Sequence, residues 1–282
     1  MEITLRKGYL TSLIGQVPEG IETVYCDHNK LTTLEGLPRG VKTVWCSDND
    51  LTSLEGLPEG VEYINCNFNK LTSLKGLPEG IQHIICQYNR ITSLEHLPKS
   101  VQNANFRCNS LTSLEGLLEG LYENLEEIEC SLNYLTSLEG LPEGLRIIYC
   151  ERNYLTSLEG LPGNVKAVYC ERNSITSLKG LPESLVHINC DRNELTSLEG
   201  LPENIKTVRC SYNKLTSLTG LPKNIDHVYC TNNYLTSLEG LPEDTETFKY
   251  FGNPIWWSRL RRGVLGELNY KKGIVKISKY LV

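Results

Sequence analysis

The side chains best suited to chemistry in this 282-residue sequence are eleven cysteine thiols. Ten of them recur at one position of a repeated pattern, namely Cys26, Cys46, Cys66, Cys86, Cys130, Cys150, Cys170, Cys190, Cys210 and Cys230. Thiols repeated in this way would lie above one another with parallel side-chain directions, whereas a disulfide needs two β-carbons that converge to ~3.8 Å. No C-x-x-C pair occurs. The pattern therefore predicts buried free thiols, a reducing compartment and no metal site.

The cysteine spacing belongs to a repeat of twenty residues, seen clearly in residues 61–80, VEYINCNFNKLTSLKGLPEG. Twelve consecutive copies begin at Ile21, Val41, Val61, Ile81, Val101, Leu125, Leu145, Val165, Leu185, Ile205, Ile225 and Thr245. An apolar residue stands two positions before the cysteine, as Val24 precedes Cys26, and this alternation predicts a short strand with one buried side. The L-T-S-L-x-G-L-P half contains glycine and proline, so it is predicted to run extended or polyproline-like rather than helical.

An asparagine stands three positions after the cysteine position in every copy, from Asn29 to Asn253. A single copy cannot bury its apolar side, so the copies must stack into one continuous core. Backbone N–H and C=O groups become buried where the chain leaves each strand, and an amide side chain can donate to and accept from them. We therefore predict that the asparagines hold these turns together.

The pattern LxxLxCxxNxLTSLxGLP resembles the leucine-rich repeat family, in its short twenty-residue class with LP in the second half. That class is known from bacterial effectors of the YopM and IpaH type, and a similar cysteine-bearing form occurs in proteins of giant amoebal viruses. The resemblance covers residues 1–254. It implies a right-handed solenoid with a parallel β-sheet on the concave face, extended convex segments, and helices at most in a C-terminal cap.

Three regions are expected from the repeat: a degenerate N-terminal coil at 1–20, a solenoid of twelve units at 21–253, and a C-terminal cap at 254–282. Seven Lys or Arg residues and one Glu follow residue 250, so the last segment carries a net charge of +6. Capping the open end of the core is the leading interpretation of this segment. Binding of an anionic membrane or a nucleic acid by the basic tail is the alternative.

Two copies depart from the pattern. In the copy at Val101, Phe106 takes the cysteine position, Ala104 is small, and Cys108 moves to an outward position, which predicts one surface thiol. A unit of 24 residues follows around 111–134, with Leu118 at the proline position and four extra residues near 121–124. Insertions of this kind form loops in solenoids, so we expect a bulge there.

No motif of a hydrolase, kinase, nucleotide-binding or calcium-binding protein is present, so we expect neither catalysis nor a cofactor. The outward strand positions instead combine aromatic residues with arginine, a composition typical of protein interfaces. The candidate partner-binding residues on the concave face are Tyr149, Tyr169, Arg152, Arg172, Arg192, Arg209, Tyr229, Tyr25 and Trp45. The alternative interpretation is that these aromatics only favour strands and stack on one another.

The sequence thus predicts a non-enzymatic scaffold that is a monomer or weak dimer and binds a protein of unknown identity. A role for a virus or pathogen protein acting on host proteins is implied by the resemblance alone. Two rows of glutamates in the second half of the repeat are interpreted as a solvated convex surface. The first residues lack a secretory apolar region and no apolar run could span a membrane, so we expect a cytoplasmic protein, of the producing cell or an infected host.

Overall fold

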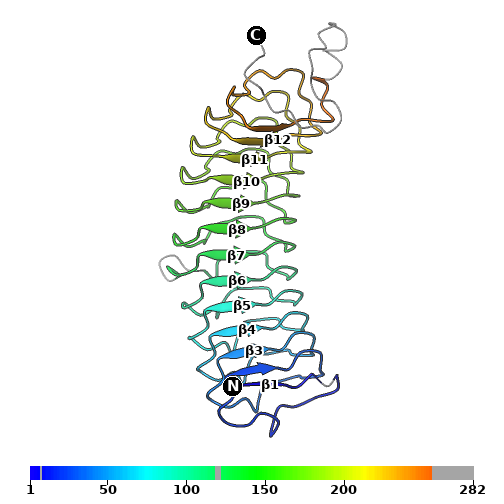
Figure 1. The fold of residues 1–282 in the computed structure, drawn as a ribbon, viewed down its shortest axis with the longest axis vertical. Helices are drawn as coiled ribbons and strands as arrows, with labels where there is room; N and C mark the ends of the chain where they lie inside the picture. Colours follow the sequence, from blue (N-terminus) through cyan, green and yellow to red (C-terminus); the bar gives the residue numbers. More distant parts are fainter. Residues whose placement is uncertain (7, 118–121, 256–282) are drawn as a thin grey trace. The chain divides into compact units, whose positions relative to one another are not determined.

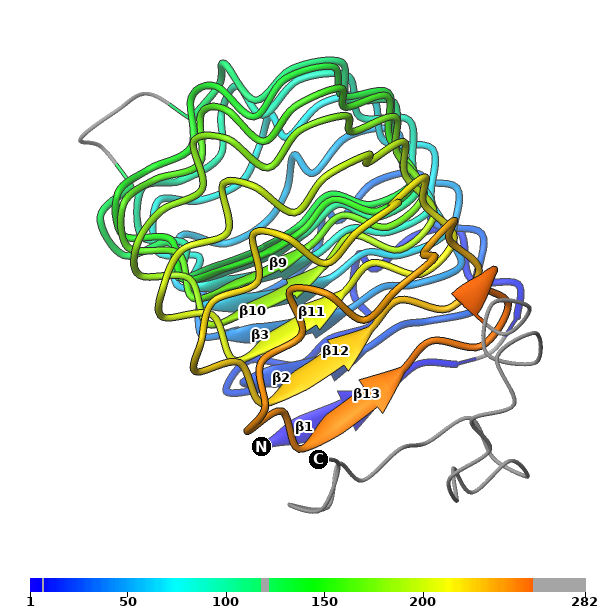
Figure 2. The same ribbon diagram turned by 90° about the horizontal axis from the view of Figure 1, so that it is seen from above.

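The computed structural model describes residues 1–6, 8–117 and 122–255 (Figure 1). The chain divides into two compact units. The N-terminal unit comprises Met1–Leu135 with Glu139–Tyr149, and the C-terminal unit comprises Thr136–Leu138 with Cys150–Val282, of which residues 150–255 are described. Each unit consists of stacked coils whose strands lie on one side, while strand-free chain forms the other (Figure 2).

The strands are three residues long. They are β1 (Glu2–Thr4), β2 (Thr23–Tyr25), β3 (Thr43–Trp45), β4 (Tyr63–Asn65), β5 (His83–Ile85), β6 (Asn103–Asn105), β7 (Glu127–Glu129) and β8 (Ile147–Tyr149) in the N-terminal unit, and β9 (Ala167–Tyr169), β10 (His187–Asn189), β11 (Thr207–Arg209), β12 (His227–Tyr229) and β13 (Thr247–Lys249) in the C-terminal unit. No helix is formed by the described residues up to 254. The predicted parallel repeat solenoid is therefore confirmed.

Pairing follows the repeat. Within each unit, neighbouring strands are parallel and pair in sequence order. The central residue of each strand meets its counterpart one repeat away, so Val24 pairs with Val44 and Val208 with Val228. From β2 to β13 these central side chains are buried, as the alternation with cysteine predicted.

The asparagines bind the turns as predicted. Asn213 is buried, and its Nδ2 donates to the carbonyl oxygens of Cys190 at 2.9 Å and Cys210 at 3.0 Å. Its Oδ1 accepts the backbone N–H of Leu195 at 2.9 Å. One side chain thus joins its own coil to the preceding one, and the same arrangement recurs at other asparagines in both units.

All ten cysteines of the repeat are free and buried. Burial raises the pKa of the Cys26 thiol to about 12, because the thiolate would lose its hydration. It raises the pKa of Cys170 and Cys210 as well. The column therefore contributes small apolar side chains to the core rather than nucleophiles. Cys108 alone among the eleven cysteines is partly exposed, as predicted.

The irregular copies are placed as follows. Phe106 is fully buried at the cysteine position beside buried Ala104, so the exchange of volumes is confirmed. The prediction that Leu118 takes the proline position is wrong. Tyr122 takes that place, because its carbonyl oxygen accepts the N–H of Leu125 at 3.1 Å, as Pro38 accepts from Val41. The four residues without a counterpart are therefore 118–121, which lie outside the described part of the chain.

The predicted C-terminal cap at 254–282 lies outside the described residues except for its first two. Ile255 is buried, and its N–H donates to the carbonyl oxygen of Leu235 at 2.8 Å, one repeat earlier. The cap and the basic tail stay predictions.

Candidate protein-binding face

Two sets of side chains cover the strand side of each unit. The first set is the outer strand face, defined as the first and third residues of every strand, whose side chains point away from the buried central residue. The second set is the turn column, defined as the residue two positions after each cysteine position. Its members are His28, Asp48, Phe68, Tyr88, Cys108, Leu132, Arg152, Arg172, Arg192, Tyr212 and Asn232.

Every residue of the turn column has a left-handed backbone, with φ between 52° and 58°. Glycine, asparagine and aspartate tolerate this conformation, whereas other residues bring their β-carbon close to the following carbonyl oxygen at a cost of about 1 kcal/mol. The column nevertheless includes Phe68, Tyr88 and three arginines. Sequence reasoning missed this strain, although Gly252, which takes the same place in the last coil, was a signal for it.

The strain at Arg172 leads to a stability prediction. Arg172→Asn should raise the free energy of unfolding by about 0.5 to 1 kcal/mol, because asparagine adopts the left-handed backbone more readily. Arg90→Asn is the control, since Arg90 is also exposed but lies outside the left-handed positions, and its effect should stay within about 0.5 kcal/mol. Urea unfolding measures both. A variant at Arg172 no more stable than the parent would contradict the strain assigned to the column.

Aromatic side chains form a row across the first strands of the N-terminal unit. The ring centroids of Tyr25 and Trp45 are 6.1 Å apart, those of Trp45 and Tyr63 are 5.2 Å apart, and those of Tyr63 and His83 are 6.5 Å apart. The predicted site residues Tyr25 and Trp45 are therefore brought together. Tyr63 and His83 were missed because they occupy the first strand position, where most other copies carry short or aliphatic side chains.

A second aromatic contact lies in the turn column of the same unit. The rings of Phe68 and Tyr88 stack with centroids 4.4 Å apart and planes 8° from parallel. Both residues remain exposed, at 53% and 45% of their surface. Large exposed aromatics at a strained backbone point to binding rather than folding as the reason for their residue type.

In the C-terminal unit, arginine and lysine side chains lie over tyrosine rings. Arg192 lies 4.1 Å from the ring centre of Tyr212, and Arg209 and Lys249 each lie 5.1 Å from that of Tyr229. Such cation–π contacts contribute ~0.5 to 1 kcal/mol at exposed sites. They hold arginine and tyrosine side chains together on the strand side of this unit.

An aspartate lies beside one of these cations, Arg209. Asp191 is 3.7 Å from the guanidinium of Arg209 and accepts the N–H of Ser211 at 2.6 Å. Burial raises the pKa of the Asp191 carboxyl, and these two partners act in the opposite direction. Asp191 thereby helps to orient Arg209, one of the predicted binding residues.

Solved structures share this arrangement. YopM from Yersinia enterocolitica WA-314 superposes with a TM-score of 0.76 at 30% identity, over 88% of this chain and 54% of that chain. This chain has the leucine-rich repeat fold. YopM from Yersinia pestis, described as a leucine-rich effector protein, gives a TM-score of 0.68 at 27% identity, over 89% of this chain and 77% of that chain. The internalin InlF from Listeria monocytogenes shares the fold, with a TM-score of 0.67 at 15% identity, over 82% of this chain and 73% of that chain.

The structural likeness exceeds what sequence comparison detects. No protein-family model matches the sequence, and no curated protein matches it. The predicted likeness to YopM-type repeats is confirmed by the superposed structures, and the likeness to proteins of giant amoebal viruses stays a prediction. This chain spans about half the length of the first YopM structure.

The structure distributes the nine predicted binding residues between the two units. Tyr25, Trp45 and Tyr149 lie in the N-terminal unit. The C-terminal unit holds Arg152, Tyr169, Arg172, Arg192, Arg209 and Tyr229. A single patch that joins Tyr149 and Tyr169 with the neighbouring arginines, as the sequence favours, therefore stays a prediction. Within the C-terminal unit, Arg152, Arg172 and Arg192 are exposed in successive coils, so the basic part of that patch is present.

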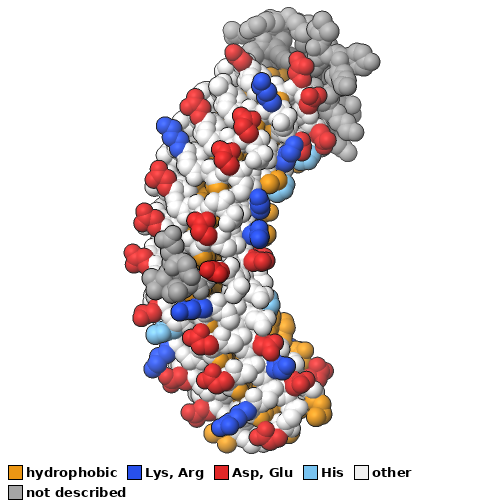
Figure 3. Space-filling view, turned by 90° about the vertical axis from the view of Figure 1, so that its left-hand side faces the viewer, with side chains coloured by type: hydrophobic (Ala, Val, Ile, Leu, Met, Phe, Trp, Pro, Cys, Tyr) orange, Lys and Arg blue, Asp and Glu red, His pale blue; other side chains and the backbone are white. Residues whose placement is uncertain are grey.

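Acidic side chains recur over the surface of this protein (Figure 3). Glu55 and Lys75 occupy the same repeat position in adjacent coils and form an ion pair of 3.2 Å with both side chains exposed. A surface pair of this kind contributes little to stability. The solvated character predicted for this row is confirmed at these two positions.

In the described part of the chain, no group of three His, Cys, Asp or Glu side chains could hold a metal ion. Nor does any helix there have the length and apolar character needed to cross a membrane.

Proposed function

We propose that this protein is a non-enzymatic scaffold that binds a protein partner on the strand side of its coils. The observation that carries the proposal is the turn column, where exposed aromatic and arginine side chains occupy a backbone conformation that favours glycine or asparagine. Folding alone would favour the smaller residues, and Asn232 occupies the same position in this chain. Backbone strain of this kind is retained where side-chain identity serves a function.

The composition of the face supports a protein rather than a small molecule as the partner. Tyrosine, tryptophan and arginine are the residue types that dominate binding energy at protein interfaces. They are spread over successive coils instead of lining a closed cavity. YopM is described as an effector protein, so a role of this chain in a pathogen that acts on host proteins is part of the proposal. Binding of a membrane or nucleic acid by the basic tail rests on residues outside the described part and does not belong to the proposal.

Charge reversal on two sides of the same coils tests the proposal. One variant replaces three arginines by glutamate: Arg152, Arg172 and Arg192. The other replaces three exposed glutamates in the second half of the repeat by lysine: Glu159, Glu183 and Glu203. A partner recovered from host lysate with the parent protein should bind the arginine variant more than tenfold more weakly, since a central anchor contributes ~2 kcal/mol or more. The glutamate variant should bind as the parent does.

The two variants change three charges each and should fold alike, because substitutions of exposed residues usually change stability by about 0.5 kcal/mol or less. Circular dichroism and urea unfolding check this condition. Loss of the partner by the glutamate variant together with full binding by the arginine variant would place the functional surface on the acidic rows instead.

A further inference from the structure

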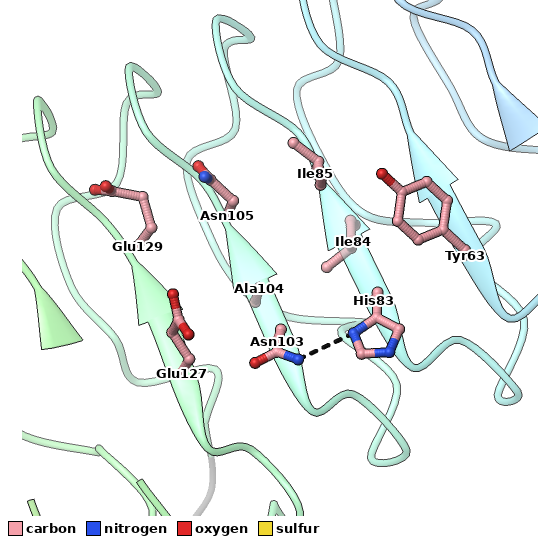
Figure 4. A pocket seen from close by; sticks show the side chains of 9 residues that line it. All are labelled: Tyr63, His83, Ile84, Ile85, Asn103, Ala104, Asn105, Glu127 and Glu129. Carbon is pink, nitrogen blue, oxygen red and sulfur yellow. Dashed lines mark hydrogen bonds between the residues drawn. The ribbon is translucent and has the colours of Figure 1, made fainter. Parts of the chain in front are cut away.

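A depression of about 230 Å³ interrupts the outer strand face of the N-terminal unit at β6 (Figure 4). Asn103 and Asn105 of β6 have short side chains, and the buried central residue between them is Ala104. Taller side chains stand on both sides. Tyr63 and Ile85 come from β4 and β5, and Glu127 and Glu129 come from β7 (Figure 4). We call this depression the β6 notch.

The two walls of the notch differ in chemistry. One wall is aromatic and aliphatic, and burial raises the pKa of the Tyr63 hydroxyl, so that ring stays neutral. The opposite wall holds two carboxylates. Among the described strands after β1, β7 is the only one with an acidic residue, and it has one at both outward positions. This pair is therefore not a feature of the repeat.

The carboxylates are only partly satisfied within the chain. Glu129 Oε1 accepts the N–H of Ser131 at 2.8 Å, and its Oε2 lies 4.0 Å from Nη1 of Arg107, the outer limit of an ion pair. The carboxylate of Glu127 forms no hydrogen bond or ion pair with any described residue. By contrast, Asp50 in the same unit is paired with Lys70 at 2.7 Å. Of the two carboxylates in the notch, only that of Glu129 therefore has a cation among the described residues within ion-pair distance, namely Arg107.

The amide floor has free hydrogen-bonding capacity as well. Asn103 Nδ2 and His83 Nδ1 are 3.0 Å apart, which fixes the orientation of that amide (Figure 4). Asn105 Oδ1 accepts the N–H of Arg107 at 3.1 Å. The amide oxygen of Asn103 has no donor among the described residues, so it can accept from a ligand in the notch.

We propose that the β6 notch binds an arginine side chain of the protein partner. A guanidinium has five N–H donors in one plane, which suits two carboxylates and an amide oxygen, and its face can pack on an aromatic ring. Its aliphatic stem would contact Ile85. The inference rests on the proposed function, because it names one chemical feature of the partner, but it concerns residues of the N-terminal unit alone.

The test uses a capped peptide, Ac-Gly-Arg-Gly-NH2, added to the full-length ¹⁵N-labelled protein and followed by nuclear magnetic resonance. Ac-Gly-Cit-Gly-NH2, in which citrulline replaces the charged guanidinium by a neutral group of the same shape, is the control peptide. We expect weak, saturable shifts of the amide signals of Asn103, Asn105 and Glu127 with the arginine peptide. The citrulline peptide should cause at least about fivefold smaller shifts at equal concentration.

Variants separate charge from shape. Glu127→Gln/Glu129→Gln keeps the size of both side chains and should weaken binding about tenfold. Asn105→Tyr should abolish binding of the arginine peptide, because the larger side chain would fill the notch. Tyrosine already occurs at the same strand position in β2, as Tyr25. Glu62→Gln is the matched control. Glu62 is an exposed acid one residue before β4 that lies 3.8 Å from Lys42, and its replacement should leave binding unchanged.

Three results would overturn the assignment: equal shifts with the two peptides, shifts that persist in the double glutamine variant, or no shift at the notch with the arginine peptide. None of them depends on the natural partner. Suppose that the variant with glutamate at positions 152, 172 and 192 loses its partner, and that the arginine peptide does not bind the notch. The scaffold function then holds and the notch proposal fails. If the notch binds the arginine peptide while that charge-reversed variant keeps its partner, the notch proposal holds and the arginine face is not the binding surface.

Discussion

Asn69→Leu should lower the free energy of unfolding by about 3 kcal/mol. Asn69 Nδ2 donates to the carbonyl oxygens of Cys46 at 3.0 Å, Cys66 at 3.1 Å and Asn67 at 3.1 Å. Its Oδ1 accepts the N–H of Leu51 at 2.9 Å. Leucine fills a similar volume but offers none of these bonds, so the loss is one of hydrogen bonding rather than packing.

The consequences for the partners of Asn69 are unequal. The carbonyl oxygens of Cys46 and Cys66 keep a second bond, from Asn49 and Asn89 respectively. The N–H of Leu51 has no other acceptor among the described residues and would be buried without one, at a cost of about 1 to 3 kcal/mol by itself. The remaining loss comes from the three carbonyl bonds, each contributing about 0.5 to 1 kcal/mol.

Lys70→Leu is the control for Asn69→Leu. Lys70 is the next residue, is exposed, and forms a surface ion pair with Asp50, so its replacement should change stability by less than about 1 kcal/mol. Urea unfolding of both variants provides the comparison. Equal stabilities would mean that the asparagines are not what joins neighbouring coils.

The repeated positions could be predicted from the sequence because identical environments recur. Each asparagine and each buried thiol meets the same neighbours one repeat away, so the reason for one residue is the reason for all. Spacing then specifies the coil, the parallel register and the buried column. The place of Tyr122 could not be predicted in this way, because a tyrosine there replaces proline through one backbone hydrogen bond that only the folded chain shows.

The candidate site was predicted less completely, since the functional positions are those that do not repeat. Exposed aromatics and arginines could be found as departures from a solvated strand face. Two features needed coordinates: the left-handed backbone that carries Phe68 and Arg172, and the notch over Asn103 and Asn105. A notch arises from differences in height between neighbouring strands, and a single sequence does not give those heights.

Gly76→Ala should destabilise the N-terminal unit by about 4 kcal/mol, for a reason that the sequence did not reveal. A helix or strand breaker is the ordinary interpretation of a glycine in this half of the repeat. In the structure, a β-carbon on Gly76 would lie 2.5 Å from the backbone nitrogen of Glu55 and 2.6 Å from the carbonyl carbon of Leu54, both in the preceding coil. Its φ of 95° is also a conformation that residues with side chains rarely adopt.

The clash of Gly76→Ala cannot be relieved locally, because its partners are backbone atoms of the preceding coil, whose strand β3 pairs with β4 of the Gly76 coil. The two coils must separate, which breaks hydrogen bonds between β3 and β4, or the turn must change shape. Gly40→Ala is the matched control, since its β-carbon would meet nothing nearer than 3.8 Å and its φ is not positive; its effect should stay within about 1 kcal/mol. Urea unfolding gives the difference in stability, and amide hydrogen exchange should show faster exchange in β3 and β4 for Gly76→Ala alone. If both alanine variants unfold alike, the close backbone approach at Gly76 does not set the separation of the coils, and the strand pairing alone must do so.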